Sequence, residues 1–109
     1  MKIAVVMDPI SEINYKKDST LLLLNEAQKR NHQLFYIEPQ DLFLKGDVPS
    51  AICSDISVKM NSQDWFALKN EREIALKDMD AILMRQDPPF DMEYVVNTYI
   101  LEAAEKEGV

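Results

Sequence analysis

The sequence predicts an α/β fold: a three-layer sandwich with a mainly parallel sheet, to which a β-hairpin is added. Two apolar runs, residues 2–7 and 33–37, flank a segment with helical spacing, all within about forty residues. A third apolar run, residues 80–84, precedes a second helical segment. Strand, helix and strand in this order are typical of a right-handed parallel βαβ unit. A length of 109 residues allows one core, so we expect a single domain over residues 1–109.

The first strand is predicted over residues 2–7, which are apolar and rich in β-branched side chains. It ends at Asp8-Pro9, because proline lacks the N–H that would continue the ladder. Asp18 or Ser19 offers a side-chain oxygen to the free N–H groups of a helix that reaches about residue 30. Asn31 tolerates left-handed backbone geometry and ends that helix.

The first helix has a mixed apolar stripe. Its members are Leu21, Leu24, Ala27 and Gln28. Leu22 and Leu23 widen this stripe, so we expect much of the first half of the helix to be covered. The second strand follows over residues 33–37.

The middle of the chain predicts a β-hairpin. Residues 42–44 and 48–58 are strand-like, and Gly46 between them supplies the positive φ that tight turns require. Residues 65–68 add a short strand. Residues 69–78 are charged and carry only a weak helical signal.

The last helix has the clearest pattern. Asp91 is a good N-cap, and Gly108 stands where a C-terminal cap is expected. Apolar side chains recur at three- and four-residue spacing; they are Val95, Val96, Tyr99, Ile100, Ala103 and Ala104. The alternation predicts that a further strand follows, with Val109 at its beginning.

Composition narrows the function classes. Twelve Lys and Arg against 19 Asp and Glu give a net charge of −7, which argues against nucleic acid and anionic membrane surfaces as partners. A single cysteine, Cys53, forms no internal disulfide, and no apolar run is long enough to span a bilayer, so we expect a cytoplasmic location. Two distant glycines, Gly46 and Gly108, cannot form a phosphate-cradling loop.

The candidate site lies at the carboxyl ends of the parallel strands, where loops converge on ligands. Arg85 ends the third strand and has the planar fork that holds a carboxylate or phosphate, but an ion pair with Asp8, Asp87 or Asp91 is the alternative that spacing favours. Asp8 and Asp87 together resemble a pair of carboxylates that binds a divalent metal ion at neighbouring strand ends. Turn capping by each aspartate is the more ordinary interpretation.

Other polar residues carry weaker signals. Lys17 and Ser19 stand just before a helix N-terminus, which attracts anions, although a solvated loop and a helix cap are the favoured interpretation. His32 is interpreted as a turn residue, because no Ser or Cys arrangement makes it part of a triad. Cys53 is interpreted as a small packing residue.

Two segments give the chain a family resemblance, and shorter matches between them follow in order at matching spacing. These segments are Ile3-Ala-Val-Val-Met-Asp8-Pro9-Ile10 and Ile82-Leu-Met-Arg85-Gln-Asp87-Pro88-Pro89-Phe90-Asp91. The shorter matches are Ile13-Asn14, Lys16-Lys17-Asp18-Ser19, Val58-Lys59, Trp65-Phe66 and Thr98-Tyr99-Ile100-Leu101-Glu102. Together they resemble the N-terminal domain of bacterial glutathione synthetase over essentially the whole chain.

The resemblance implies a Rossmann-like pre-ATP-grasp domain that precedes an ATP-grasp unit. It implies a ligase of glutathione biosynthesis that joins γ-glutamylcysteine to glycine with ATP and magnesium through an acyl phosphate. The nucleotide and the metals belong to later domains, so these 109 residues alone would hold no cofactor, would not catalyse ligation, and would bind γ-glutamylcysteine or glutathione weakly or not at all. The full-length enzyme would be a homo-oligomer.

Arg85 is the position that the resemblance assigns to a substrate or product carboxylate, which reverses the preference from spacing alone. Asp8, Lys17, Ser19 and Asp87 match family positions and are interpreted as shaping the loops. Two alternatives stay open: a stand-alone receiver-like signalling domain in which Asp8 and Asp87 bind magnesium, and a purely structural role in subunit contacts.

Overall fold

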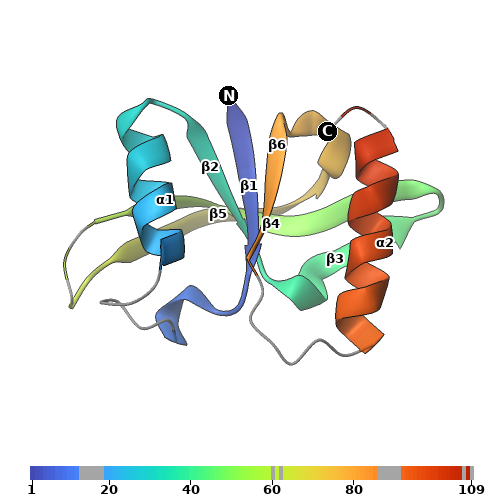
Figure 1. Cartoon of the computed structure of the whole chain (residues 1–109), viewed down its shortest axis with the longest axis horizontal. Helices are drawn as coiled ribbons and strands as arrows, with labels where there is room; N and C mark the ends of the chain where they lie inside the picture. Colours follow the sequence, from blue (N-terminus) through green and yellow to red (C-terminus); the bar gives the residue numbers. More distant parts are fainter. Residues whose placement is uncertain (13–18, 60, 62, 86–91, 107, 109) are drawn as a thin grey trace.

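The computed structural model describes residues 1–12, 19–59, 61, 63–85, 92–106 and 108. Within these residues, two helices and six strands follow one another (Figure 1). They are β1 (Lys2–Met7), α1 (Ser19–Lys29), β2 (Gln33–Ile37), β3 (Leu42–Lys45), β4 (Val48–Val58), β5 (Phe66–Ala75), β6 (Ala81–Arg85) and α2 (Met92–Lys106). Three short 3₁₀ turns connect them: η1 (Ile10–Glu12), η2 (Pro39–Asp41) and η3 (Leu76–Asp78).

All six strands form one sheet, in the order β3-β4-β2-β1-β6, with β5 paired to β4. β1 lies parallel to both β2 and β6, which confirms the predicted β1-α1-β2 unit. The three pairings made by β4 are antiparallel. The sheet is therefore mixed and mostly antiparallel, and the prediction of a mainly parallel sheet is not confirmed. The reason is that β4 is 11 residues long and pairs with β2, so the β3–β4 hairpin becomes part of the main sheet.

β5 corrects the prediction for residues 69–78. Residues Phe66–Ala75 form a strand that pairs with β4, from Phe66 opposite Val58 to Ala75 opposite Ser50. Its charged side chains are mostly exposed, as expected for a strand at the edge of a sheet. The local composition is poor in apolar residues, so pairing with β4 rather than burial of an apolar face determines this strand.

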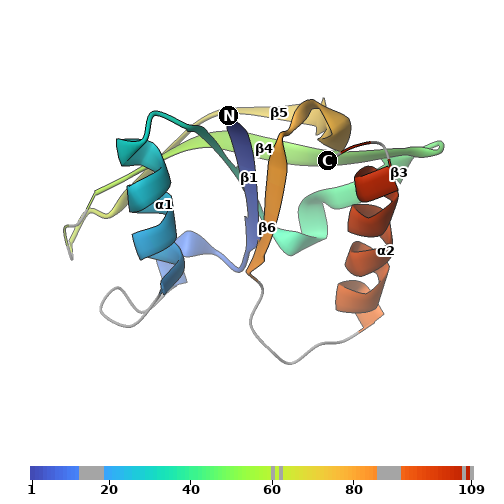
Figure 2. The same ribbon diagram turned by 45° about the horizontal axis from the view of Figure 1, so that its top comes forward.

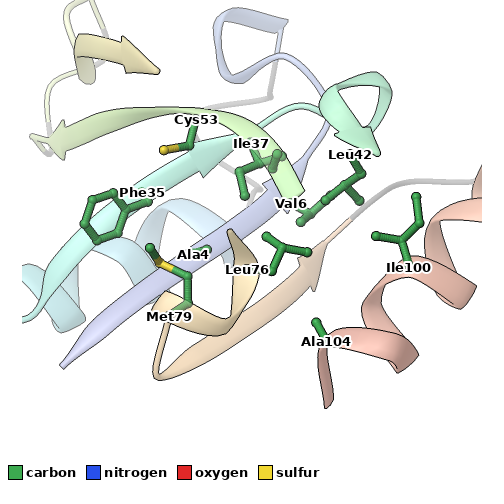
Figure 3. Close-up of a cluster of buried hydrophobic side chains, with 11 residues drawn as sticks. Ala4, Val6, Phe35, Ile37, Leu42, Cys53, Leu76, Met79, Ile100 and Ala104 are labelled. Carbon is green, nitrogen blue, oxygen red and sulfur yellow. The ribbon is translucent and has the colours of Figure 1, made fainter. Parts of the chain in front are cut away.

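The two helices lie on opposite faces of the sheet, as a layered α/β arrangement requires. Alternate residues of a strand point to opposite faces. Accordingly, Ala4 and Val6 of β1 pack in a cluster with Ile100 of α2 (Figure 3), whereas Val5 packs in a second cluster with Leu24 of α1. Figure 2 also shows α1 and α2 separated by β1 and β6.

The exposed faces of the helices differ in part from those expected. Leu24 is only 1% exposed, but Leu22 is 58% and Leu23 46% exposed, so the first half of α1 is covered on one side only. In α2, Tyr99 is 67% exposed although it was expected in the apolar stripe, while Asn97 is 2% exposed. The Asn97 amide Nδ2 donates to the carbonyl oxygen of Pro39 at 2.7 Å, which compensates for its burial.

The predicted turn residues adopt the expected backbone geometry. Asn31 ends α1 with φ 64°, and Gly46 joins β3 to β4 with φ 63°. Gly108 follows α2 with φ 103°, and its N–H donates to the carbonyl oxygen of Glu105 at 3.0 Å. The candidate caps Asp18 and Asp91, and also Val109, lie outside the described residues, as do the side chains of Val95 and Val96.

Cys53 and His32 occupy the ordinary positions that were predicted for them. The Cys53 thiol is free and 1% exposed, and burial raises its pKa. His32 follows the Asn31 turn, and its Nδ1 lies 3.2 Å from the amino group of Met1. None of the described helices is long and apolar enough to cross a membrane.

Candidate functional site

The candidate site lies where the three parallel strands end. Because β1 pairs in parallel with both β2 and β6, the residues that follow these strands meet at one edge of the sheet. Met7, the last residue of β1, is in register with Arg85, the last residue of β6. Asp8 therefore follows the strand next to Arg85, and Glu38 follows β2 on the other side of β1.

Arg85 is held by a side chain that sequence reasoning missed. Its Nε donates a hydrogen bond to Oγ1 of Thr20 at 3.1 Å, although the two residues are 65 positions apart. Thr20 lies in the first turn of α1 and is 5% exposed, and Arg85 is half-buried. The guanidinium is thus located between the end of β6 and the start of α1, where a carboxylate or phosphate could meet its planar fork.

The other predicted site residues are placed only in part. Asp8 is half-buried at the end of β1, and Ser19 is the first residue of α1. Lys17 and Asp87 lie outside the described residues. The structure therefore brings Asp8, Arg85 and the start of α1 to one edge of the sheet.

The short turn η1, which follows Asp8 and Pro9, is fixed by two aromatic side chains. The N–H of Ile10 donates to the Tyr36 hydroxyl oxygen at 3.0 Å, and that hydroxyl donates to Oε2 of Glu38 at 2.9 Å. Nε1 of Trp65 donates to the carbonyl oxygen of Ile10 at 3.1 Å. These bonds connect the loop after β1 to the end of β2 and to the residue before β5. In the sequence, these hydrogen bonds were indicated only by the general tendency of the Tyr36 hydroxyl and the Trp65 indole N–H to find partners when buried. The partners themselves could not be identified, because most of them are distant along the chain.

Replacing Tyr36 with phenylalanine is expected to destabilise the fold by about 1–2 kcal/mol, because the buried N–H of Ile10 loses its acceptor. Burial raises the pKa of Tyr36 well above its usual 10. The folded state then keeps this proton while the unfolded state loses it, so stability falls as the pH rises above about 10. In Tyr36→Phe, this contribution to the fall in stability above about pH 10 should be absent. Urea denaturation from pH 8 upward measures both effects.

Tyr99→Phe is the matched control, because Tyr99 is 67% exposed. It should leave both the stability and its alkaline dependence unchanged. Equal alkaline slopes for the original protein and Tyr36→Phe would contradict the proposed burial of the Tyr36 hydroxyl.

The described residues do not fit a nucleotide or metal site. Within the described ranges, no group of three or more His, Cys, Asp or Glu side chains is placed to hold a metal ion. Gly46 and Gly108, the chain's two glycines, both serve turns, at the β3–β4 hairpin and after α2. The Arg85 guanidinium is a cationic group that the described residues place at this edge.

Comparison with known proteins identifies the family. Residues 1–109 match the family described as prokaryotic glutathione synthetase, N-terminal domain. The chain is 49% identical over 109 residues to glutathione synthetase of Vibrio cholerae, with 100% of the chain and 34% of the relative covered. It is 47% identical over 108 residues to glutathione synthetase of Escherichia coli K12, and 48% identical over 108 residues to that of Salmonella typhi, with 99% of the chain and 34% of each relative covered.

The match covers essentially the whole chain, which spans about a third of the length of these relatives. Both the match along residues 1–109 and the level of identity establish the family. The chain belongs to the N-terminal domain family of prokaryotic glutathione synthetases.

Proposed function

We propose that this chain is the substrate-side, N-terminal domain of an ATP-dependent ligase that joins γ-glutamylcysteine to glycine. The relatives named glutathione synthetase support this reaction, since glutathione is the tripeptide that such a ligation forms. The chain spans about a third of their length, so the proposed reaction is that of the whole protein. Residues 1–109 form the first domain of that protein in this proposal.

The observation that carries the proposal is the position of Arg85. γ-Glutamylcysteine and glutathione each carry two carboxylates, and a guanidinium can bind a carboxylate through two parallel N–H···O bonds. Arg85 is half-buried at the carboxyl edge of the parallel strands and is anchored to α1 through Thr20. We assign it as the contact of this domain to a substrate or product carboxylate. Asp8, Lys17, Ser19 and Asp87 shape the surrounding loops.

ATP and magnesium are assigned to the remaining part of the protein. The described residues offer neither a glycine-rich phosphate loop nor a cluster of metal ligands, so they do not fit either group. No catalytic residue is therefore assigned within this chain. We also propose a cytoplasmic location and a homo-oligomeric full-length enzyme. No observation in the described part of the chain favours a receiver-like signalling domain.

The test compares the 109-residue chain with the full-length protein that contains it. The full-length protein should release inorganic phosphate from ATP only when γ-glutamylcysteine, glycine and magnesium are all present, and mass spectrometry should detect glutathione. The isolated chain should show no release above background under the same conditions. Turnover by the isolated chain, or a full-length protein whose ATP hydrolysis ignores the dipeptide, would contradict the proposal.

A further inference from the structure

The hydrogen bond between Arg85 and Thr20 joins the end of β6 to the start of α1, which are 65 positions apart in the sequence. The donor is Nε, the inner nitrogen of the guanidinium, and the acceptor is the Thr20 hydroxyl at 3.1 Å. Nε belongs to the same rigid plane as the two outer nitrogens. A hydrogen bond at Nε therefore fixes the direction in which that plane faces.

Thr20 is a firm anchor because α1 is held along its length. Leu21 and Leu24, each 1% exposed, pack against the sheet. Near the other end of the helix, Nε2 of Gln28 donates to the carbonyl oxygen of Val58 at 3.0 Å, and the N–H of Val58 donates to Oε1 of Gln28 at 2.9 Å. The hydroxyl at the start of α1 is thus held in a fixed position on the sheet.

We propose that Thr20 is a positioning residue for substrate binding: its hydroxyl orients the Arg85 guanidinium toward the substrate carboxylate. This inference rests on the proposed function of Arg85. An arginine side chain has several rotatable bonds, and holding it in one rotamer before the substrate arrives reduces the entropy lost on binding. Thr20 is suited to this task because it is 5% exposed, so little water competes for its hydroxyl, and its branched Cβ restricts its own rotamer.

Two substitutions in the full-length protein separate the hydroxyl from the shape of the side chain. Thr20→Val keeps the branched shape and removes the acceptor, whereas Thr20→Ser keeps the acceptor on a smaller side chain. We expect Thr20→Val to raise the KM for γ-glutamylcysteine by about tenfold, with kcat and the KM values for ATP and glycine changed less than about twofold. Thr20→Ser should stay close to the original KM.

A double-substitution cycle with Arg85→Ala tests whether Thr20 acts through Arg85. Once Arg85 is absent, adding Thr20→Val should raise the KM no further. If Thr20→Val does not fold, Thr20→Ala replaces it in the cycle with the same expected KM, and the urea midpoint of each variant establishes that it is folded.

The outcomes distinguish this inference from the proposed function. An unchanged KM in folded Thr20→Val, together with a raised KM in Arg85→Ala, would overturn the role of Thr20 and leave that of Arg85 intact. An unchanged KM in Arg85→Ala would overturn both. A Thr20→Ser variant with a KM as high as that of Thr20→Val, or a further rise in the double variant, would also overturn the inference.

Discussion

Arg85→Ala in the full-length protein is expected to raise the KM for γ-glutamylcysteine by about 100-fold, because we propose that its half-buried guanidinium binds a substrate carboxylate through charge-assisted bonds. Arg85→Lys retains the charge but loses the planar fork, so a rise of about tenfold is expected. Steady-state rates with the dipeptide varied, at saturating ATP and glycine, measure both values.

Arg30→Ala provides the matched control for the loss of an arginine. The Arg30 side chain is 71% exposed at the end of α1 and forms an ion pair on the helix surface with Glu26, at 3.3 Å between Nε and Oε1. Exposed pairs of this kind contribute little free energy. The KM of Arg30→Ala should therefore match that of the original protein. Equal KM values for the two alanine variants would remove the support for Arg85 as a substrate contact.

Leu24→Ala is expected to lower the free energy of unfolding by about 3 kcal/mol, because truncation of a buried leucine loses transfer free energy and leaves a cavity. Leu24 is 1% exposed and packs in the cluster between α1 and the sheet, with Val5 and Leu21 among its members. Urea denaturation of the purified chain measures this difference, with one common m value, the slope of unfolding free energy against urea concentration, used for all variants.

Leu22→Ala is the control in the same helix, with the same change of helix propensity. Leu22 is 58% exposed, so the expected loss is below about 0.5 kcal/mol. The difference between the two variants then reports burial alone. Similar losses in both would contradict the face on which α1 packs.

The elements with strong local signals could be predicted closely. β1 and β2 have the expected boundaries, α1 ends at the expected Asn31 turn, and the hairpin turns at Gly46. In these segments, apolar periodicity and the conformational preference of a single turn residue agree. The family could also be predicted, from the resemblance of the segments around Asp8 and Arg85 to those of bacterial glutathione synthetases.

Local pattern failed where distant contacts decide the outcome. β5 is rich in charged residues and forms a strand because it pairs with β4 along most of its length. A short segment of the sequence does not reveal this pairing. Asn97 is buried because the carbonyl oxygen of Pro39 meets its amide, and Tyr99 beside it is exposed.

The sequence by itself determined the α/β class, the parallel β1-α1-β2 unit, the family, and Arg85 as the residue with the most specific chemistry. Only the tertiary structure decided that the sheet is mixed, because β4 forms antiparallel pairs with three strands. It alone placed Thr20 against Arg85. A hydrogen bond between side chains 65 positions apart leaves no periodicity in the sequence, since it depends on how β6 and α1 are brought together by the strands between them.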